Sequence, residues 1–579
     1  MDRKEEKGPA DYARENKTKN ERSSFMSTSN NVCPNGSYQT RPGDDNQNKP
    51  HVSHSTNSAS SNFNYSSETS VSPSPPHYHE GGGMFDRLIA LKKNNPNVKI
   101  LFPLSSSNGV GALTQTTLPK RSTWGDNDFV QMPYDPCNTK IQVYKESLDR
   151  TSKKKWEIIN DELAKLKSLV ASPGFGEKLR QSVSQYNSKY GKSSFNLLTE
   201  SLSLKSQFEF IAEEAAKMEN NFPFGIPVLK SGKHSKVTSI FFNQKQICSI
   251  LANAFLCTFP KREGKLPEIN FHELYHGTLG NNEAEKKIEK LKCILHYFER
   301  VRKIKGNGNI LSFERRSLSF TEEPDWGYSS TRKMSYVNVF NNEGIESAKN
   351  CLQVDFANQF IGGGVIGRGM VMEEVRFSIC PELIVARLFT EKLEKDEVLI
   401  ITGCEQFCKY RGYGSTFQYA GDIVDDTKLD EYGRRKTEIV AMDAYNFSEQ
   451  DPRKQFGSHL VKRELNKSYC AFAPKKYQEK TPVATGHWGC GAFKGDQELK
   501  FIIQWMAASE AGRELHYYTG DAEQSKEIIR IVKFLGRKDV NIKKLFHAIE
   551  EYNRKEIEYS FNKSSKSLFT FFEKTHNLW

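Results

Sequence analysis

The sequence predicts an α/β fold: a three-layer domain with helices on both faces of a sheet, preceded by a helical accessory domain and a disordered N-terminal tail. Three observations support this prediction. Residues 1–83 are poor in apolar side chains, residues 121–310 repeat apolar residues at helical spacing, and residues 311–579 alternate short β-rich runs with helical runs. A chain of 579 residues also exceeds what one hydrophobic core holds, so more than one domain is expected.

The N-terminal segment 1–83 is predicted to be disordered. No Leu or Ile occurs before Leu88, and Ser, Asn, Thr, Pro and His dominate. Such a segment cannot bury enough apolar surface to offset its chain entropy. Its glycine triplet, Gly81–Gly83, has no strand before it and is interpreted as linker.

The next segment, 84–120, is predicted to be a linker or docking segment that carries a short apolar island at 84–104, MFDRLIALKKNNPNVKILFPL. The island could dock a partner, or it could be the first element that packs onto the fold. Packing is the favoured interpretation.

The segment 121–310 is predicted to form the helical domain. Apolar residues recur every three or four positions in WEIINDELAKLKSLV, FNLLTESLSLKSQFEFIAEEAAKM and KKIEKLKCILHYFERVRKI. The run QKQICSILANAFLCTF is apolar on nearly all sides, which predicts a buried central helix.

The segment 311–579 is predicted to form the three-layer α/β domain. Its β-rich runs are MSYVNVF, CLQVDF, EVLIITG, TEIVAMDAY and ELHYYTG. The helical runs between them are CPELIVARLFTEKL, ELKFIIQWMAAS and KEIIRIVKFLG. Alternation of this kind places helices on both faces of the sheet.

Composition narrows the class of partner and compartment. The 83 Lys and Arg exceed the 71 Asp and Glu by 12, which favours an anionic partner. The eleven scattered cysteines, with no CxxC, indicate reduced intracellular thiols and no structural zinc site. No apolar run is long enough to cross a membrane, and the amino terminus has no apolar signal-peptide core. We expect a nuclear and cytoplasmic protein; Lys153–Lys155 and Pro119–Arg121 are weak import candidates, each more simply a solvated charge run.

The most informative stretch is VDFANQFIGGGVIGRGMVMEEVRF, residues 354–377. A strand-like run delivers Asp355 and Asn358, three glycines follow at 362–364, and Glu373 and Glu374 come about ten residues later. Glycine lets a backbone approach a ligand closely, and carboxylates in an apolar setting are usually paired or used. The pattern predicts a phosphate or sugar cradle with an acid attached.

A nicotinamide-binding loop is the alternative for these glycines, because Gly362, Gly364 and Gly367 fit GxGxxG. That motif opens a helix directly and needs an acid at the end of the next strand, about twenty residues on. Here Glu382 stands at that distance, inside a predicted helix. The dinucleotide interpretation is therefore disfavoured.

The glycine and glutamate stretch resembles the signature of the poly(ADP-ribose) glycohydrolase family, a triple glycine followed after a short spacer by Gln-Glu-Glu. Further segments are similar and occur in the family's order: QKQICSILANAFLCTFPKR, PEINFHELYHG, LIITGCEQF, RELNKSYCAF and ATGHWGCGAFKGD. The resemblance covers roughly residues 120–560. It implies a macrodomain-like catalytic domain behind a helical domain, and hydrolysis of ribose–ribose bonds in poly(ADP-ribose) to release ADP-ribose.

The resemblance also assigns residues. It makes Glu374 the catalytic glutamate, Glu373 its neighbour on the ribose hydroxyls, and Asp355 a third residue of the catalytic group. The substrate-binding positions it implies are Asn358 near the ribose, Gly363 and Gly364 at the diphosphate, Gly491, Ala492 and Phe493 in a second diphosphate loop, Tyr413 over the ligand, Glu346 at the adenine, and Met372 beside the glutamates.

Elementary chemistry is compatible with these roles. Backbone N–H groups of glycine loops can donate hydrogen bonds to a diphosphate, and a carboxylic acid can protonate the departing ribose hydroxyl and then serve as base toward water. Like-charge repulsion between Glu373 and Glu374 should raise a pKa and keep one of them protonated. No metal or cofactor is expected. The partners expected are poly(ADP-ribose) and proteins that carry it, with no membrane, no sequence-specific nucleic acid and a monomeric state.

Two positions depart from the family pattern. Met372 stands where the family has Gln, and a thioether makes weaker hydrogen bonds than an amide. His487 stands where Asn is usual, a milder change because both side chains hydrogen-bond. The leading interpretation is an active hydrolase. The alternatives are an ADP-ribose-binding module weakened in catalysis by Met372, and a general nucleic-acid binder, which lacks any RRM, KH or zinc-finger motif.

Overall fold

The computed structural model describes residues 83–102, 128–136, 138–143, 150–169, 172–190, 197, 205–232, 237–262, 264–328, 330–475, 479–558, 566–575 and 579. The predicted tail, apart from Gly83, lies outside the described residues, as does Pro119–Arg121. Nothing in the described part therefore bears on either prediction.

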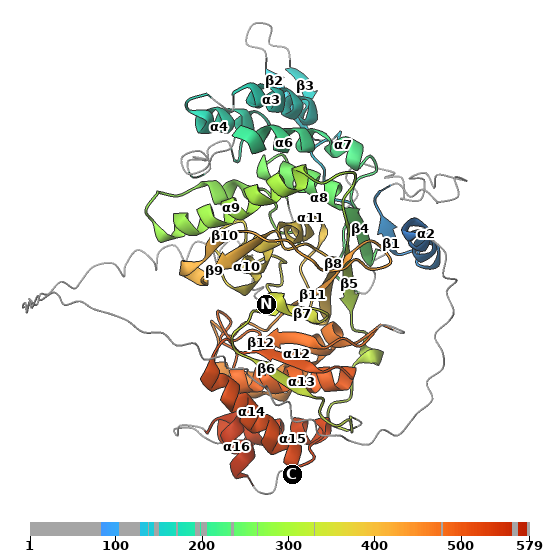
Figure 1. Ribbon diagram of the computed structural model, residues 1–579, viewed down its shortest axis with the longest axis vertical. Helices are drawn as coiled ribbons and strands as arrows, with labels where there is room; N and C mark the ends of the chain where they lie inside the picture. The colour runs from blue at the N-terminus through green and yellow to red at the C-terminus, as the bar shows by residue number, and fades with distance from the viewer. Residues whose placement is uncertain are drawn as a thin grey trace, which may run out of the picture. The chain divides into compact units, whose positions relative to one another are not determined.

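A nine-stranded mixed sheet forms the centre of the fold (Figure 1). Its spatial order is β1-β4-β5-β8-β11-β7-β12-β13-β6, and the five strands from β11 to β6 are mutually parallel. In that order the bounds are Val98–Ile100, Ser239–Asn243, Ile310–Ser317, Glu397–Gly403, Arg435–Asp443, Leu352–Ala357, Val483–Gly486, Leu515–Tyr518 and Val337–Phe340.

Helices cover both faces of this sheet, which confirms the predicted three layers (Figure 1). Alternate residues of one strand enter different cores. Leu399 and Ile401 of β8 pack with α8 (Gln244–Phe255), α9 (Asn282–Arg302) and α11 (Ala386–Phe389). Val398 and Ile400 pack with α12 (Ser458–Phe472) and α13 (Gln497–Ala511). This is the period-two alternation of a strand buried on both sides. On the second face lie α12 (Ser458–Phe472), α13 (Gln497–Ala511), α14 (Ala522–Arg537), α15 (Ile542–Tyr552) and α16 (Leu568–Lys574).

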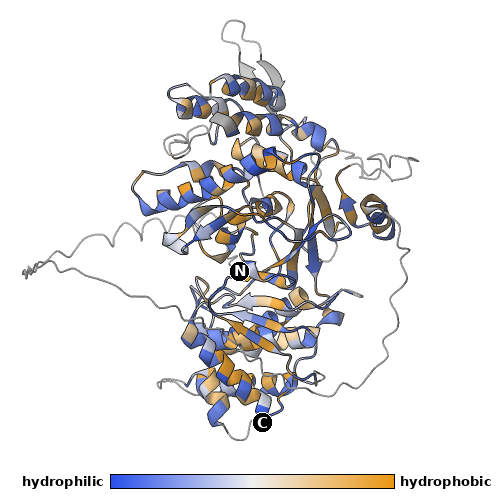
Figure 2. Ribbon diagram, in the orientation of Figure 1, coloured by the Kyte–Doolittle hydropathy of each residue, from blue (hydrophilic) through white to orange (hydrophobic). Residues whose placement is uncertain are grey.

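The helices of the other face come largely from the segment predicted to be helical. The predicted buried central helix is α8 (Gln244–Phe255), in which every residue except Lys245 is buried. Figure 2 shows hydrophilic and hydrophobic residues alternating along α9, as expected for a helix with one solvated side. The elements here are α3 (Lys155–Leu169), α4 (Phe175–Tyr186), α6 (Lys205–Ala216), α7 (Met218–Asn221), α8, α9 (Asn282–Arg302), and the hairpin of β2 (Thr139–Val143) and β3 (Arg150–Lys154).

The apolar island after residue 83 is part of the sheet layer. It forms α2 (Met84–Asn94) and then β1, which pairs in parallel with β4. Leu88 and Ile100 are buried against Phe241 of β4 and Ile310 of β5. The strand β4 itself lies within the segment for which the sequence predicts only helices, so the sheet is wider than expected.

One predicted helix is broken. The run CPELIVARLFTEKL forms a 3₁₀ segment, Pro381–Val385, followed by the single turn α11 (Ala386–Phe389). The helix ends before Thr390, because the Leu229 N–H donates to the Phe389 carbonyl and Leu229 forms a β-bridge with Thr390. Among the described helices, none is long and apolar enough to span a bilayer.

Candidate active site

A cavity of about 570 Å3 lies at the carboxyl ends of the parallel strands. Residues that follow β6, β7, β11, β12 and β13 line it, and these strands run in the same direction. Carboxyl ends of parallel strands meet at one edge of a sheet, which is where α/β proteins bind ligands. The cavity brings together every predicted site residue except Asp355: Glu346, Asn358, Gly363, Gly364, Met372, Glu373, Glu374, Tyr413, Gly491, Ala492 and Phe493.

The two adjacent glutamates begin α10 (Met372–Ile379) and are held by backbone N–H groups of the preceding loop. Glu373 accepts from the N–H of Gly362 at 2.5 Å and from that of Asn358 at 2.9 Å. Glu374 accepts from the N–H of Gly364 at 2.7 Å and from that of Val371 at 2.9 Å. Both side chains are buried, so the four main-chain donors replace the hydrogen bonds that water would make to exposed carboxylates.

Glycine at position 363 is required by these carboxylates. A Cβ there would lie 2.6 Å from Glu373 Oε2 and 2.6 Å from Glu374 Oε1, and φ is +45°. The same crowding occurs at Gly369, where a Cβ would meet Glu374 Oε1 at 2.5 Å. The loop is therefore free of side chains on the side that faces its own acids.

The N–H groups of Gly363 and Gly364 are already used within the protein. Gly363 donates to the Phe360 carbonyl and Gly364 donates to Glu374. Asn358 Oδ1 likewise accepts from the Phe360 N–H at 2.9 Å, in a turn that starts the loop. Contact of Gly363 and Gly364 with a diphosphate stays a prediction, and in this conformation their N–H groups serve to hold the acids.

The second loop, after β12, offers open donors. Within the described residues, no acceptor binds the backbone N–H of Gly491, Ala492 or Phe493. Successive unpaired N–H groups of this kind form an anion-binding nest. Behind the loop, Lys500 lies over the Trp488 ring and pairs with Glu464, and all three side chains are buried.

Two buried cations hold the glycine loop from behind, and neither was predicted. Lys290 of α9 donates to the carbonyls of Gly364, Val365 and Gly367 at 3.2, 3.1 and 3.0 Å. Arg387 of α11 donates to two further carbonyls of the same loop. Burial lowers the pKa of Lys290 to about 7, with the nearby Glu374 opposing the shift.

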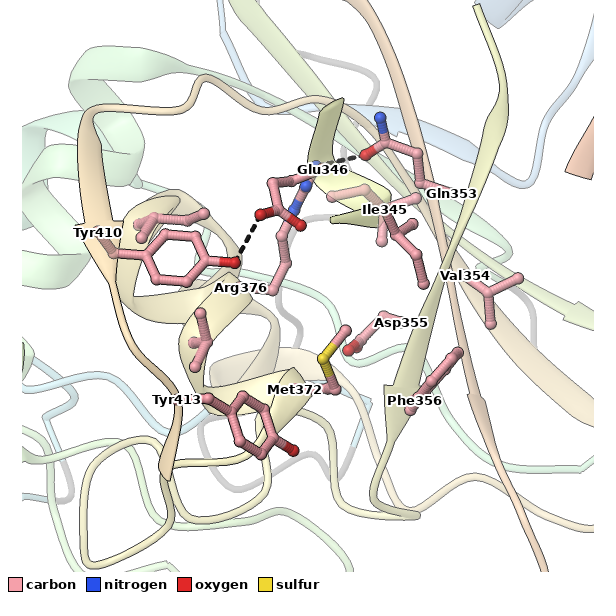
Figure 3. Close-up of a pocket in the computed structure, with 13 residues that line it drawn as sticks. Ile345, Glu346, Gln353, Val354, Asp355, Phe356, Met372, Arg376, Tyr410 and Tyr413 are labelled. Carbon is pink, nitrogen blue, oxygen red and sulfur yellow. Dashed lines mark hydrogen bonds between the residues drawn. The ribbon is translucent and has the colours of Figure 1, made fainter. Parts of the chain in front are cut away.

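Asp355 of β7 lies in the wall of a smaller cavity of about 40 Å3, beside Met372 (Figure 3). Its side chain is 4% exposed, and neither carboxylate oxygen has a hydrogen-bond partner among the described residues. Burial raises the pKa of Asp355 to about 8, with Arg376 opposing the shift and Glu374 adding to it. Burial also raises the pKa of Glu373, with Asp355 and then Glu374 as further causes.

The raised pKa of Glu373 has more than one cause. Like-charge repulsion between the paired glutamates was expected to raise a pKa, and Glu374 does raise the pKa of Glu373; burial is the larger cause, and Asp355 contributes before Glu374 does. Asp355, Glu373 and Glu374 are all buried, whereas the sequence pattern places only two of these carboxyls side by side.

The remaining predicted residues form the opposite wall. Tyr413 is 52% exposed, between Gly412 and Gly414 in left-handed conformations. Glu346 accepts a hydrogen bond from the Tyr410 hydroxyl at 2.6 Å (Figure 3). His487 faces the cavity; burial lowers its pKa, and its Nε2 is buried without a partner within the described part of the chain.

Met372 belongs to the apolar part of this wall. Its side chain packs against the cluster formed by Ile345, Ala348 and Tyr518, and Figure 3 shows its thioether beside Asp355. A thioether suits this contact because it is polarizable and has little need of a hydrogen bond.

Comparison with known proteins gives the family. Residues 323–527 match the model described as poly(ADP-ribose) glycohydrolase, macro domain fold, and residues 199–315 match the helical domain of the same family. Poly(ADP-ribose) glycohydrolase 1 of Arabidopsis thaliana is 30% identical over 430 residues, which is 61% of this chain and 77% of the relative. The chain belongs to the poly(ADP-ribose) glycohydrolase family.

Other members of this glycosidase family are similar over shorter stretches. Poly(ADP-ribose) glycohydrolase 1 of Caenorhabditis elegans is 36% identical over 277 residues, covering 45% of this chain and 35% of the relative. A crystal structure of the Deinococcus radiodurans glycohydrolase in complex with ADP-ribose aligns with 15% identity and a TM-score of 0.23, over 36% of this chain and 90% of that chain.

Lys290 and Arg387, the two cations that were not predicted, each stand at an apolar position of the sequence pattern. Lys290 stands on the buried side of α9, next to Leu291 and one turn before Ile294, where helical periodicity expects an apolar residue. Arg387 is the one charge in the apolar run LIVARLF. A charge at a core position of a glycohydrolase-family fold points to backbone or carboxylate partners.

The pKa of Asp355 makes stability depend on pH. The unfolded carboxyl titrates near pH ~4 and the folded one at about 8, so the folded chain holds an extra proton between these values and loses stability as pH rises. We predict that Asp355→Asn gains stability relative to wild type between pH 5 and pH 8, by on the order of 1 kcal/mol or more. Urea denaturation midpoints at both pH values measure this.

Exposed Asp426→Asn is the control, because a surface ion pair with Lys349 contributes little. The same Asp355→Asn shift at both pH values would contradict the assignment.

Proposed function

We propose that this chain hydrolyses the ribose–ribose O-glycosidic bonds of poly(ADP-ribose) and releases ADP-ribose, with Glu374 as acid and base. The observation that carries the proposal is the pair of buried carboxylates facing, across one cavity, a loop with three open backbone donors. A volume of about 570 Å3 suits a ligand of nucleotide size. The proposed partners are proteins that carry the polymer.

The substrate's diphosphate would lie on the second loop. The N–H groups of Gly491, Ala492 and Phe493 can donate to its oxygens without displacing an internal hydrogen bond. The adenine would lie toward Glu346 and Tyr413, where an exposed ring can cover a base. This leaves the riboses over Asn358 and the two glutamates.

In the proposed reaction Glu374 protonates the departing ribose oxygen and then removes a proton from the attacking water. Glu373, whose pKa is raised, can remain protonated and donate to a ribose hydroxyl. The usual retaining pair flanks the sugar at about 5 Å. Glu373 and Glu374 are held by the same loop, on the same side of the cavity, and so cannot flank one sugar. We therefore propose an oxocarbenium-like transition state without a glycosyl-enzyme; a trapped adduct on either glutamate would overturn this step.

The alternative is a binding module whose catalysis is lost through Met372. The hydrolase is favoured because Met372 packs against apolar neighbours in the wall and leaves the main-chain hydrogen bonds of the two glutamates in place. Both glutamates keep their four main-chain donors.

Replacing Glu374 by glutamine separates the hydrolase from the binding module. Glu374→Gln should abolish release of ADP-ribose from labelled polymer while ADP-ribose binding persists, because an amide cannot deliver the proton. Glu382→Gln is a matched control: Glu382 is also fully buried and accepts one backbone N–H and one amide N–H, but lies outside the cavity. Intact polymer at high wild-type concentration would favour the binding module.

Met372→Gln tests whether the amide usual in the family improves catalysis. A restored amide should raise kcat by up to about tenfold, the worth of one hydrogen bond, with the ADP-ribose affinity little changed. Initial rates of polymer cleavage beside wild type measure the effect. A Met372→Gln variant that cleaves while wild type does not would identify the natural chain as the binding module.

A further inference from the structure

Arg387 lies behind the glycine loop and outside the cavity. Its side chain is 5% exposed, and the hydrogen bonds that it donates within the described residues go to backbone carbonyls. Nη1 donates to the carbonyls of Ile361 and Gly363, at 2.9 Å each, and Nε donates to the carbonyl of Glu268 at 2.8 Å. One nitrogen thus binds two carbonyls of the loop.

These two carbonyls belong to the peptide groups that hold the glutamates. The Ile361 carbonyl shares its peptide with the Gly362 N–H, which donates to Glu373. The Gly363 carbonyl shares its peptide with the Gly364 N–H, which donates to Glu374. In a planar trans peptide the C=O and N–H point in opposite directions. Fixing both carbonyls on Arg387 therefore aims both N–H groups at the carboxylates.

We propose that Arg387 is a positioning residue, which sets the orientation of Glu373 and Glu374 through the peptide groups 361–362 and 363–364. The inference rests on the proposed hydrolysis. Arg387 touches no part of the cavity, so it acts only through the loop. Gly362 permits the contact, because a Cβ there would lie 3.2 Å from Arg387 Nη1.

The charge of Arg387 adds to this geometry. Burial lowers its pKa to about 10, and Glu373, Glu268, Glu374 and Glu273 oppose the shift, so the guanidinium is charged at neutral pH. A charged donor binds carbonyls more strongly than a neutral one, which stiffens the loop. Lys290 then fixes the carbonyls that follow.

Arg387→Lys is the test variant, because it keeps the charge but has a single ammonium nitrogen, which cannot occupy the fixed positions of both Nη1, bound to the loop, and Nε, bound to Glu268. Arg513→Lys is the matched control: Arg513 is 2% exposed and, among the described residues, donates to Phe472 and Thr481, away from the cavity. We expect kcat of Arg387→Lys to fall on the order of 100-fold, as for an acid misplaced by about 1 Å. The Kd for ADP-ribose and the melting temperature should match those of Arg513→Lys.

Three results overturn the proposal: an unchanged kcat in Arg387→Lys, an equal loss in Arg513→Lys, or a loss confined to KM. Should wild type release no ADP-ribose, the proposed hydrolysis fails, and positioning is then judged from crystal structures of wild type and Arg387→Lys. Peptides 361–362 and 363–364 rotated, with displaced carboxylates, support positioning; unmoved carboxylates overturn it.

Discussion

The site depends on one interaction, the hydrogen bonding of two adjacent carboxylates by the main chain of a glycine loop. Four backbone N–H groups converge on Glu373 and Glu374, and the loop reverses tightly enough to supply three of them. Carboxylates buried without such donors would cost several kcal/mol each. The loop, the start of α10 and the cations behind the loop all serve this arrangement.

This arrangement divides the work between two loops. N–H groups of the glycine loop after β7 donate to the protein's own glutamates, whereas the N–H groups of residues 491–493, in the loop after β12, have no acceptor among the described residues. Glycine serves a different purpose in each. At Gly363 it admits two carboxylates, and at Gly491 an added Cβ would meet nothing within 4 Å, so the backbone is bare toward the cavity.

The three layers could be predicted because the spacing of apolar residues along the sequence follows which faces of a helix or strand are buried. Both-face burial of β8 and all-round burial of α8 each leave a readable pattern. In the central sheet the sequence pattern missed β1, β4, β5 and β12. The short strands β1 and β4 lie directly beside helices that are also apolar, β5 spans the boundary between the two predicted segments, and β12 has only four residues, so none of them shows a separate strand pattern. The pattern also joined residues 381–389 into one helix, because the bridge between Leu229 and Thr390 that ends α11 is a contact between distant segments.

The sequence predicted which residues line the candidate site, but it did not predict the hydrogen bonds between them. Spacing located Glu373, Glu374 and the glycines, and the family resemblance added residues 491–493. That the glycine N–H groups bind the acids depends on the tertiary path of the loop. The positions of Lys290 and Arg387 behind it depend on packing between segments about 75 and 24 residues away.

The most direct measurement is the polymer-cleavage rate of Gly363→Ala. The added methyl would press on both carboxylates at 2.6 Å without touching the second loop. Gly536→Ala is the control, because nothing lies within 4 Å of a Cβ at that helical position. We predict that Gly363→Ala stays folded, binds ADP-ribose and loses cleavage on the order of 100-fold. Cleavage at the wild-type rate would contradict it.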